Sequence, residues 1–126
     1  MELNKISYDI RGSAFKVFNE LGPGLFESVY ETALAYELEQ LGYEVKTQVV
    51  IPVVYADIEI ESGFRADLIV NEMVIIELKS VEKIMPVHYK QILTYLRLSD
   101  LRLGFLINFN ADTLDKNNLI RVVNNF

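Results

Sequence analysis

The stretch from residue 66 to residue 79, ADLIVNEMVIIELK, decides the fold, because its two apolar runs are separated by a short polar turn. Asn71-Glu72 supplies that turn, so the runs are expected to form antiparallel strands. Asp67 and Glu77 interrupt the runs far from the turn, and both carboxylates can lie at one end of the hairpin. An ionised acid beside apolar strand residues is costly unless a cation or hydrogen-bond donors compensate it. The two acids therefore predict a site for a divalent cation.

Lys79 follows Glu77 by two residues, so both side chains leave the same face of the strand. A lysine beside a bound cation is suited to orienting a water molecule or stabilising the charge that develops on a phosphate. The alternative interpretation of Asp67, Glu77 and Lys79 is a buried structural ion pair.

Outward from this hairpin, the period of the apolar residues predicts an α/β fold with a central mixed β-sheet flanked by helices. The expected elements are helices at residues 3–20, 26–41 and 86–98, strands at residues 45–53, 55–61, 64–70, 73–79 and 103–109, and a closing helical turn with an edge strand around residues 119–123. Ser62-Gly63 is the expected turn between residues 61 and 64. The run Met73 to Ile76 is apolar on both faces, which predicts a central strand. No repeat or linker interrupts residues 1–126, so we expect one domain.

Three residues outside the hairpin are candidate members of the same site. Glu27 falls in the first turn of the second helix, where the helix dipole favours a carboxylate and the side chain would point toward the sheet end. Gln91 and Tyr95 are four residues apart and share a face of the third predicted helix. The alternative interpretations are an ordinary first-turn glutamate for Glu27 and, for Tyr95, a core residue with its hydroxyl at the rim. The one histidine, His88, is expected to be a partly exposed surface residue near a helix start.

The order of these residues resembles the PD-(D/E)XK nuclease superfamily. An aspartate, then Glu-x-Lys after a turn, then Gln-x-x-x-Tyr on the next helix occur here as Asp67, Glu77-x-Lys79 and Gln91-x-x-x-Tyr95. The residue before the aspartate is Ala66 instead of proline, a departure that removes no ligand.

The upstream spacing Gly24, Glu27, Tyr30 resembles the GxxExxY family within that superfamily. The resemblance implies that Asp67 and Glu77 ligate Mg²⁺ or Mn²⁺ and that Lys79 helps to activate the attacking water. By the same resemblance Glu27 completes the metal site, and Gln91 and Tyr95 contact the substrate or support the ligands. Tyr30 is expected to be a packing residue.

The net charge of −6 counts against a nucleic-acid partner, since phosphate binding normally leaves a basic surface. The acids, however, concentrate before residue 78, and the remainder of the chain is net positive. A cation held by carboxylates also cancels part of the acidic total. Nucleic acid therefore remains the expected partner.

The composition argues against a membrane-spanning protein, a secreted protein and a cysteine-dependent enzyme. No apolar run reaches the roughly 20 residues of a membrane-spanning helix, and the first residues lack a secretion signal. The absence of cysteine excludes disulfides and cysteine nucleophiles and fits the cytoplasm. A small nuclease can gain a substrate groove by pairing, so a homodimer is a further expectation.

These observations favour a metal-dependent nuclease that hydrolyses phosphodiester bonds in DNA or RNA. One alternative is a catalytically silent nuclease fold used as a binding or regulatory module, because intact ligands show a capability and not turnover. Another is a hydrolase of a small nucleotide, which the acidic total and the short chain suggest.

Overall fold

The computed structural model describes residues 2–124, apart from the side chains of residues 61–63. Its elements are α1 (Glu2–Leu21), α2 (Glu27–Gln40), β1 (Val45–Tyr55), β2 (Ile58–Val70), β3 (Val74–Lys79), α3 (Pro86–Ser99), β4 (Leu103–Asn108) and β5 (Leu119–Val123). Within the described residues the strands form one sheet in the order β1-β2-β3-β4-β5. β3 and β4 are parallel, and the other neighbours are antiparallel. The predicted fold class, a central mixed sheet flanked by helices, is confirmed.

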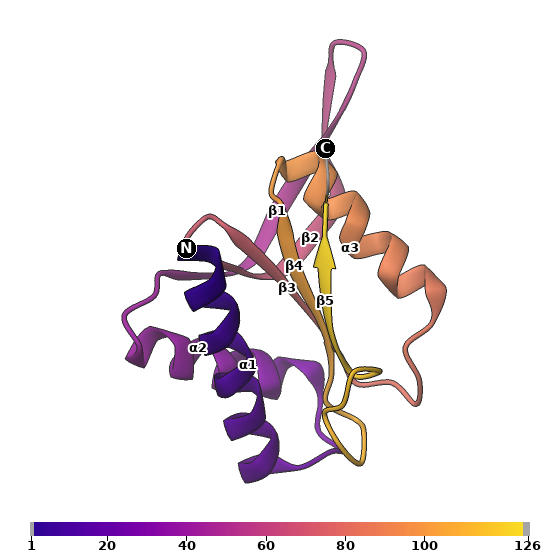
Figure 1. Ribbon diagram of the computed structural model, residues 1–126. Coiled ribbons are helices and arrows are strands. Elements are labelled where there is room, and N and C mark those ends of the chain that lie inside the picture. Colours follow the sequence, from indigo (N-terminus) through magenta and orange to yellow (C-terminus); the bar gives the residue numbers. More distant parts are fainter. Residues whose placement is uncertain (1, 125–126) are drawn as a thin grey trace.

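The sheet is the middle layer of three, with α1 and α2 on one face and α3 on the other (Figure 1). Leu78 and Ile76 of β3 pack in the core beneath α1 and α2, whereas Ile75 packs beneath α3 with Ile92. Because alternate residues of β3 enter different cores, both faces of this strand are buried. The prediction that it is a central strand is confirmed.

Gly104 allows α3 to lie directly on β4. A Cβ built there would be 2.9 Å from Cδ1 of Ile92 and 3.3 Å from the carbonyl oxygen of Ile75. We therefore expect Gly104→Ala to lower the free energy of unfolding by about 1–3 kcal/mol, because the added methyl overpacks this contact. Gly12 in α1 is the matched control, since its Cβ would meet no described atom within 4 Å.

Alanine at Gly12 should raise the free energy of unfolding by up to about 1 kcal/mol through its higher helix propensity. Urea unfolding of both variants measures the two effects. Equal effects of the same sign would show that α3 does not press on Gly104.

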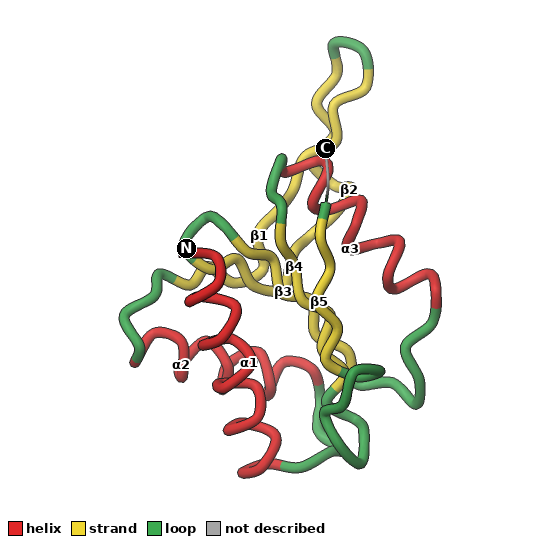
Figure 2. The backbone as a smooth tube through the Cα atoms, in the orientation of Figure 1, coloured by secondary structure: helices red, strands yellow, loops and turns green. Residues whose placement is uncertain are grey.

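The hairpin of β1 and β2 differs from the prediction. Its turn lies at Ala56-Asp57, where Ala56 has a φ of 54°, and not at Ser62-Gly63. The expected strands at residues 55–61 and 64–70 are one strand, β2, with a register shift opposite residues 51–53 of β1. The paired residues beyond this shift form an arm that projects from the sheet (Figure 2).

The predicted turn between β2 and β3 and the predicted turn before β5 agree with the structure more closely. Asn71 and Glu72 both have positive φ, and the N–H of Met73 donates to the carbonyl of Val70 at 2.9 Å, which closes a tight hairpin turn. β5 is an edge strand as predicted, and the residues before it make one turn in which the N–H of Leu119 donates to the carbonyl of Asp115, four residues back, at 2.8 Å. The tight turn fixes the register of β2 on β3, which determines how their acids meet.

Candidate functional site

Asp67 and Glu77 meet where the pairing of β2 with β3 ends. The last regular pair is Leu68 with Ile76, and Asp67 and Glu77 are the next residue on each strand. The N–H of Asp67 donates to Oε2 of Glu77 at 2.9 Å, and the N–H of Leu78 donates to Oδ2 of Asp67 at 2.8 Å. Each carboxylate thus accepts a backbone hydrogen bond from the strand opposite, and the pair is fixed at one end of the hairpin.

The side chains of β2 stop alternating regularly between the two faces of the sheet at Asp67. Ala66 packs in the core beneath α3, whereas Leu68, two residues on, packs beneath α1 and α2. Across from Asp67 on β1, Gln48 has a φ of 52°, in the left-handed region that non-glycine residues rarely adopt. This local distortion of both strands turns Asp67 out of the regular alternation.

Gln48 also joins two acids that the sequence analysis did not connect. Its Nε2 donates to Oε1 of Glu31 at 2.6 Å and to Oδ1 of Asp67 at 3.3 Å. Burial raises the pKa of Glu31, the charge of Asp67 raises it further, and the hydrogen bond from Gln48 opposes both. Glu31 could have been found from the sequence because it follows Glu27 by four residues on α2. Gln48 carries no comparable signal.

Substitutions at Gln48 test the left-handed backbone. In an ordinary strand glycine is less stable than alanine by roughly 0.5–1 kcal/mol. Here we expect the reverse order, with Gln48→Gly more stable than Gln48→Ala by about 1 kcal/mol, because only alanine keeps the cost of positive φ. Denaturant unfolding measures the difference, and Gln48→Ala as the more stable variant would contradict this geometry.

Glu27 reaches the same end of the sheet from the first turn of α2. The N–H of Ser80, the residue after β3, donates to Oε2 of Glu27 at 2.9 Å. Tyr30 is fully buried, stacks on Phe109 and donates its hydroxyl to the carbonyl of Gly22 at 2.6 Å. Tyr30 therefore supports the loop that precedes Glu27, in agreement with its predicted packing role.

Burial and like charge raise the pKa values of the paired acids. Glu77 is 5% exposed, and burial, then the charges of Asp67 and Glu27, raise its pKa to about 8. Burial also raises the pKa of Asp67, while the N–H of Leu78 and the charge of Lys79 lower it. Two acids that share a poorly hydrated place favour a bound cation, which would stabilise both ionised forms.

Lys79 and Tyr95 lie near this pair. Lys79 is partly exposed, and its charge lowers the pKa values of Asp67 and Glu77. In the described part of the chain no carboxylate lies within 4 Å of its amine. Burial raises the pKa of Tyr95, and the charges of Glu77 and Asp67 raise it further. Tyr95 also packs on Phe64, with ring centroids 5.0 Å apart.

Gln91 and His88 lie on the first two turns of α3. Gln91 is exposed, and none of the hydrogen bonds between described residues includes its side chain, so it is not drawn into the acidic pair. His88 is half-buried and accepts a hydrogen bond at Nδ1 from the N–H of Met85 at 3.0 Å. Burial and the charge of Lys79 lower the pKa of His88, whereas Glu27 raises it. His88 is thus a partly exposed residue near the start of α3, as predicted, and the charges of Lys79 and Glu27 act on it.

The carboxylates of Asp67, Glu77 and Glu27 are oxygen ligands of the kind that Mg²⁺ and Mn²⁺ prefer. Asp67, Glu77 and Glu27 each use one carboxylate oxygen for a backbone N–H, and each has a second oxygen that accepts no backbone hydrogen bond from described residues. Among residues 2–124, however, no three Asp, Glu or His side chains are grouped closely enough to hold a metal ion. The assembled part of the donor set is thus the Asp67–Glu77 pair, and Glu27 is held separately by Ser80.

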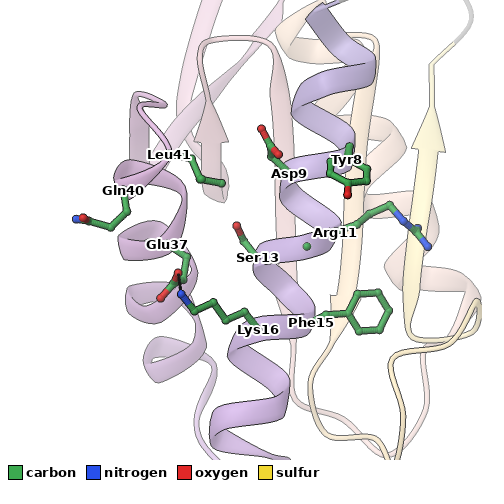
Figure 3. Close-up of a pocket in the computed structure, with 10 residues that line it drawn as sticks. Tyr8, Asp9, Arg11, Ser13, Phe15, Lys16, Glu37, Gln40 and Leu41 are labelled. Atoms are coloured by element: carbon green, nitrogen blue, oxygen red, sulfur yellow. Dashed lines mark ion pairs between the residues drawn. The ribbon is translucent and has the colours of Figure 1, made fainter.

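A separate cavity of about 470 Å³ lies between α1 and α2 (Figure 3). An ion pair between Lys16 and Glu37, 3.0 Å long, crosses it. Gln40 and Leu41 place this cavity at the end of α2 opposite Glu27. None of the paired acids lines it, so it is distinct from the candidate site.

The fold and the site define an α/β protein with paired carboxylates and a lysine at the end of a central hairpin. A family model described as the PD-(D/E)XK nuclease superfamily matches residues 4–122, and the chain therefore belongs to this superfamily. Comparison with curated proteins and with solved structures gave no significant match. Along the described helices, no segment combines the length and the apolar character that crossing a membrane requires.

Proposed function

We propose that the protein is a metal-dependent nuclease that hydrolyses phosphodiester bonds in DNA, with RNA as the other candidate substrate. The observation that carries the proposal is the pairing of Asp67 on β2 with Glu77 on β3, in which each carboxylate accepts a backbone N–H of the opposite strand. Lys79 follows Glu77 by two residues on β3, and its charge lowers the pKa values of both acids. Membership of a nuclease superfamily supports the same reaction class.

Asp67 and Glu77 would hold Mg²⁺ or Mn²⁺, with Glu27 completing the site. When bound, the metal would polarise a phosphate oxygen and lower the pKa of a water molecule. Lys79 would orient the attacking water and stabilise the negative charge that develops on the phosphate. Its lack of a carboxylate partner among described residues supports this role, because the amine is available to substrate.

Gln91 and Tyr95 would act at the substrate side of the site. The exposed amide of Gln91 is available to a phosphate or a base. The packing of Tyr95 on Phe64, close to the charges of Asp67 and Glu77, suits a supporting role beneath the ligands.

We further propose that the chain is a member of the GxxExxY family. Gly24 has a φ of 100°, Glu27 accepts a hydrogen bond from Ser80, and Tyr30 secures the preceding loop. The spacing thus corresponds to one structural unit that presents a carboxylate to the end of the sheet.

We also propose that residues 1–126 act as one domain in the cytoplasm. Two copies of the chain would pair to form a substrate groove, and sedimentation velocity would test whether the protein is a dimer.

The nuclease function can be tested with labelled single-stranded, duplex and branched DNA, RNA, and small nucleotides, each incubated with Mn²⁺ or Mg²⁺. We expect nucleic-acid cleavage that stops with EDTA and is absent from Asp67→Asn. Equal products from wild type and Asp67→Asn would reveal a contaminating nuclease and reject the proposal. Cleavage of nucleotides alone would instead support a small-molecule hydrolase.

A catalytically silent binding module is the second candidate, and the separation of Glu27 from a complete three-carboxylate group favours it. Titration calorimetry with Mn²⁺ distinguishes the two functions. Binding that is lost in Asp67→Asn supports the nuclease, whereas no binding to wild type supports the silent module.

A further inference from the structure

We propose that Phe26 is a stacking platform for an unpaired nucleobase beside the candidate site, and hence that the substrate is single-stranded or locally unpaired. This inference rests on the proposed nuclease function and adds a substrate class to it. Phe26 is 83% exposed, although it directly precedes Glu27.

Phe26 does not serve the helix that it precedes. It occupies the N-cap position of α2, with φ −70° and ψ 153°, and makes no side-chain capping hydrogen bond. Residues with a side-chain oxygen are preferred at that position, because they satisfy the free N–H groups of the first turn. A phenylalanine there gains neither capping nor burial, so its aromatic ring is available for a ligand.

The chain on both sides of Phe26 is held in place. The carbonyl of Leu25 accepts from Oγ of Ser80 at 2.9 Å, and its N–H donates to the hydroxyl of Tyr30 at 3.2 Å. On the other side, Glu27 accepts from the N–H of Ser80 at 2.9 Å. An aromatic group presented from a fixed backbone loses little conformational entropy when it binds a flat partner.

The position of Phe26 associates it with the site rather than with a protein-docking surface. It lines a cavity of about 440 Å³ together with Gly24, Leu25, Glu27, Ser80 and Asn110. Glu27 and Ser80 both line this cavity, and Ser80 directly follows Lys79 at the end of β3, so the cavity borders the candidate site. The apolar groove along α2, which includes Val29 and Tyr36, is a different surface, and Phe26 does not line it.

The charge of the protein favours an unpaired base over a duplex. Affinity for duplex DNA depends mainly on basic residues that neutralise phosphates, and this chain has a net charge of −6. Stacking on an aromatic ring needs no positive surface and tolerates any base, but the base must be free of its neighbours. Phe26 therefore offers affinity that does not depend on a basic surface.

The test measures binding by fluorescence anisotropy in the Lys79→Ala background with Mg²⁺, which limits cleavage of the probe. The probes are a short single-stranded oligonucleotide and the same sequence as a duplex. We expect Phe26→Leu, which keeps an apolar side chain but loses the π face, to weaken single-strand binding roughly tenfold. Phe26→Tyr should bind within about twofold of the parent, as expected for stacking on an aromatic face.

Tyr36→Leu is the matched control, because Tyr36 is another exposed aromatic residue, at 57%, but lies within α2 and lines the other groove. It should leave binding unchanged. Equal losses from Phe26→Leu and Tyr36→Leu, equal effects on both probes, or a changed sedimentation coefficient in Phe26→Leu would overturn the inference. If Phe26→Leu cleaves single strands as fast as wild type, the stacking inference is rejected and the nuclease function stands. If the wild-type protein neither binds nor cleaves any nucleic acid, both the stacking inference and the proposed function are rejected.

Discussion

Lys79→Ala should lower the rate of phosphodiester cleavage by roughly 100-fold or more under single-turnover conditions. The reason is that Lys79 is close enough to Asp67 and Glu77 for its charge to lower the pKa of both, and the substitution removes the group that would stabilise charge on the phosphate. The fold should persist, because Lys79 is partly exposed and has no ion-pair partner among described residues. Circular dichroism and thermal melting would verify that the variant is folded.

Lys83→Ala is the matched control for this prediction. Lys83 is an exposed lysine in the segment after β3, so its loss changes the net charge of the protein by the same amount. We expect it to change the cleavage rate less than about threefold, as is usual for a screened surface charge. Similar losses from both variants would show that general electrostatic attraction, and not the position of Lys79, drives the reaction.

Glu77→Gln should make the protein more stable when no metal is present and less stable than wild type when Mn²⁺ is bound. The pKa of Glu77 in the folded protein is about 8, above its ordinary value of 4.5, so its stabilising contribution is full below pH 4.5 and is lost as the pH rises through about 8. Glutamine cannot ionise, yet its amide oxygen can still accept the hydrogen bond from Asp67. At pH 8 in EDTA, the variant should therefore exceed wild type by on the order of 2 kcal/mol.

With Mn²⁺ present the order should reverse, because ligand binding stabilises only a protein that can bind the ion. Thermal melting from pH 5 to pH 8, with EDTA or Mn²⁺, measures both effects. Glu72→Gln is the control, since Glu72 is an exposed acid of the nearby turn that pairs with Lys46. A wild-type advantage at pH 8 in EDTA would show that Glu77 is ionised and well compensated without a metal.

The sequence was sufficient to predict the hairpin of β2 and β3 and its paired acids, because both depend on local chemistry. Asn71-Glu72 forms the expected turn, and the expected cluster of Asp67 and Glu77 follows from the register that the turn sets. The distortion at Gln48 could not be predicted in this way. It depends on how β1 lies across β2, and no local signal marks a glutamine that adopts positive φ.

The third helix shows a second limit of sequence reasoning. Gln91 and Tyr95 share a helix face, and the spacing alone predicts similar surroundings for both. In the structure Tyr95 is buried and Gln91 is exposed, because α3 packs closely on the sheet only from Ile92 onward. Spacing sets the direction of a side chain, whereas its burial depends on where the helix meets the sheet.

The central claim, a divalent metal site at Asp67 and Glu77, is tested most directly by anomalous diffraction from crystals soaked in Mn²⁺. We predict an anomalous difference peak within coordination distance of carboxylate oxygens from both Asp67 and Glu77, with Glu27 moved toward it or joined to it by water. In crystals of Asp67→Asn the peak should disappear. A fully soaked wild-type crystal with no peak between Asp67 and Glu77 would contradict the account.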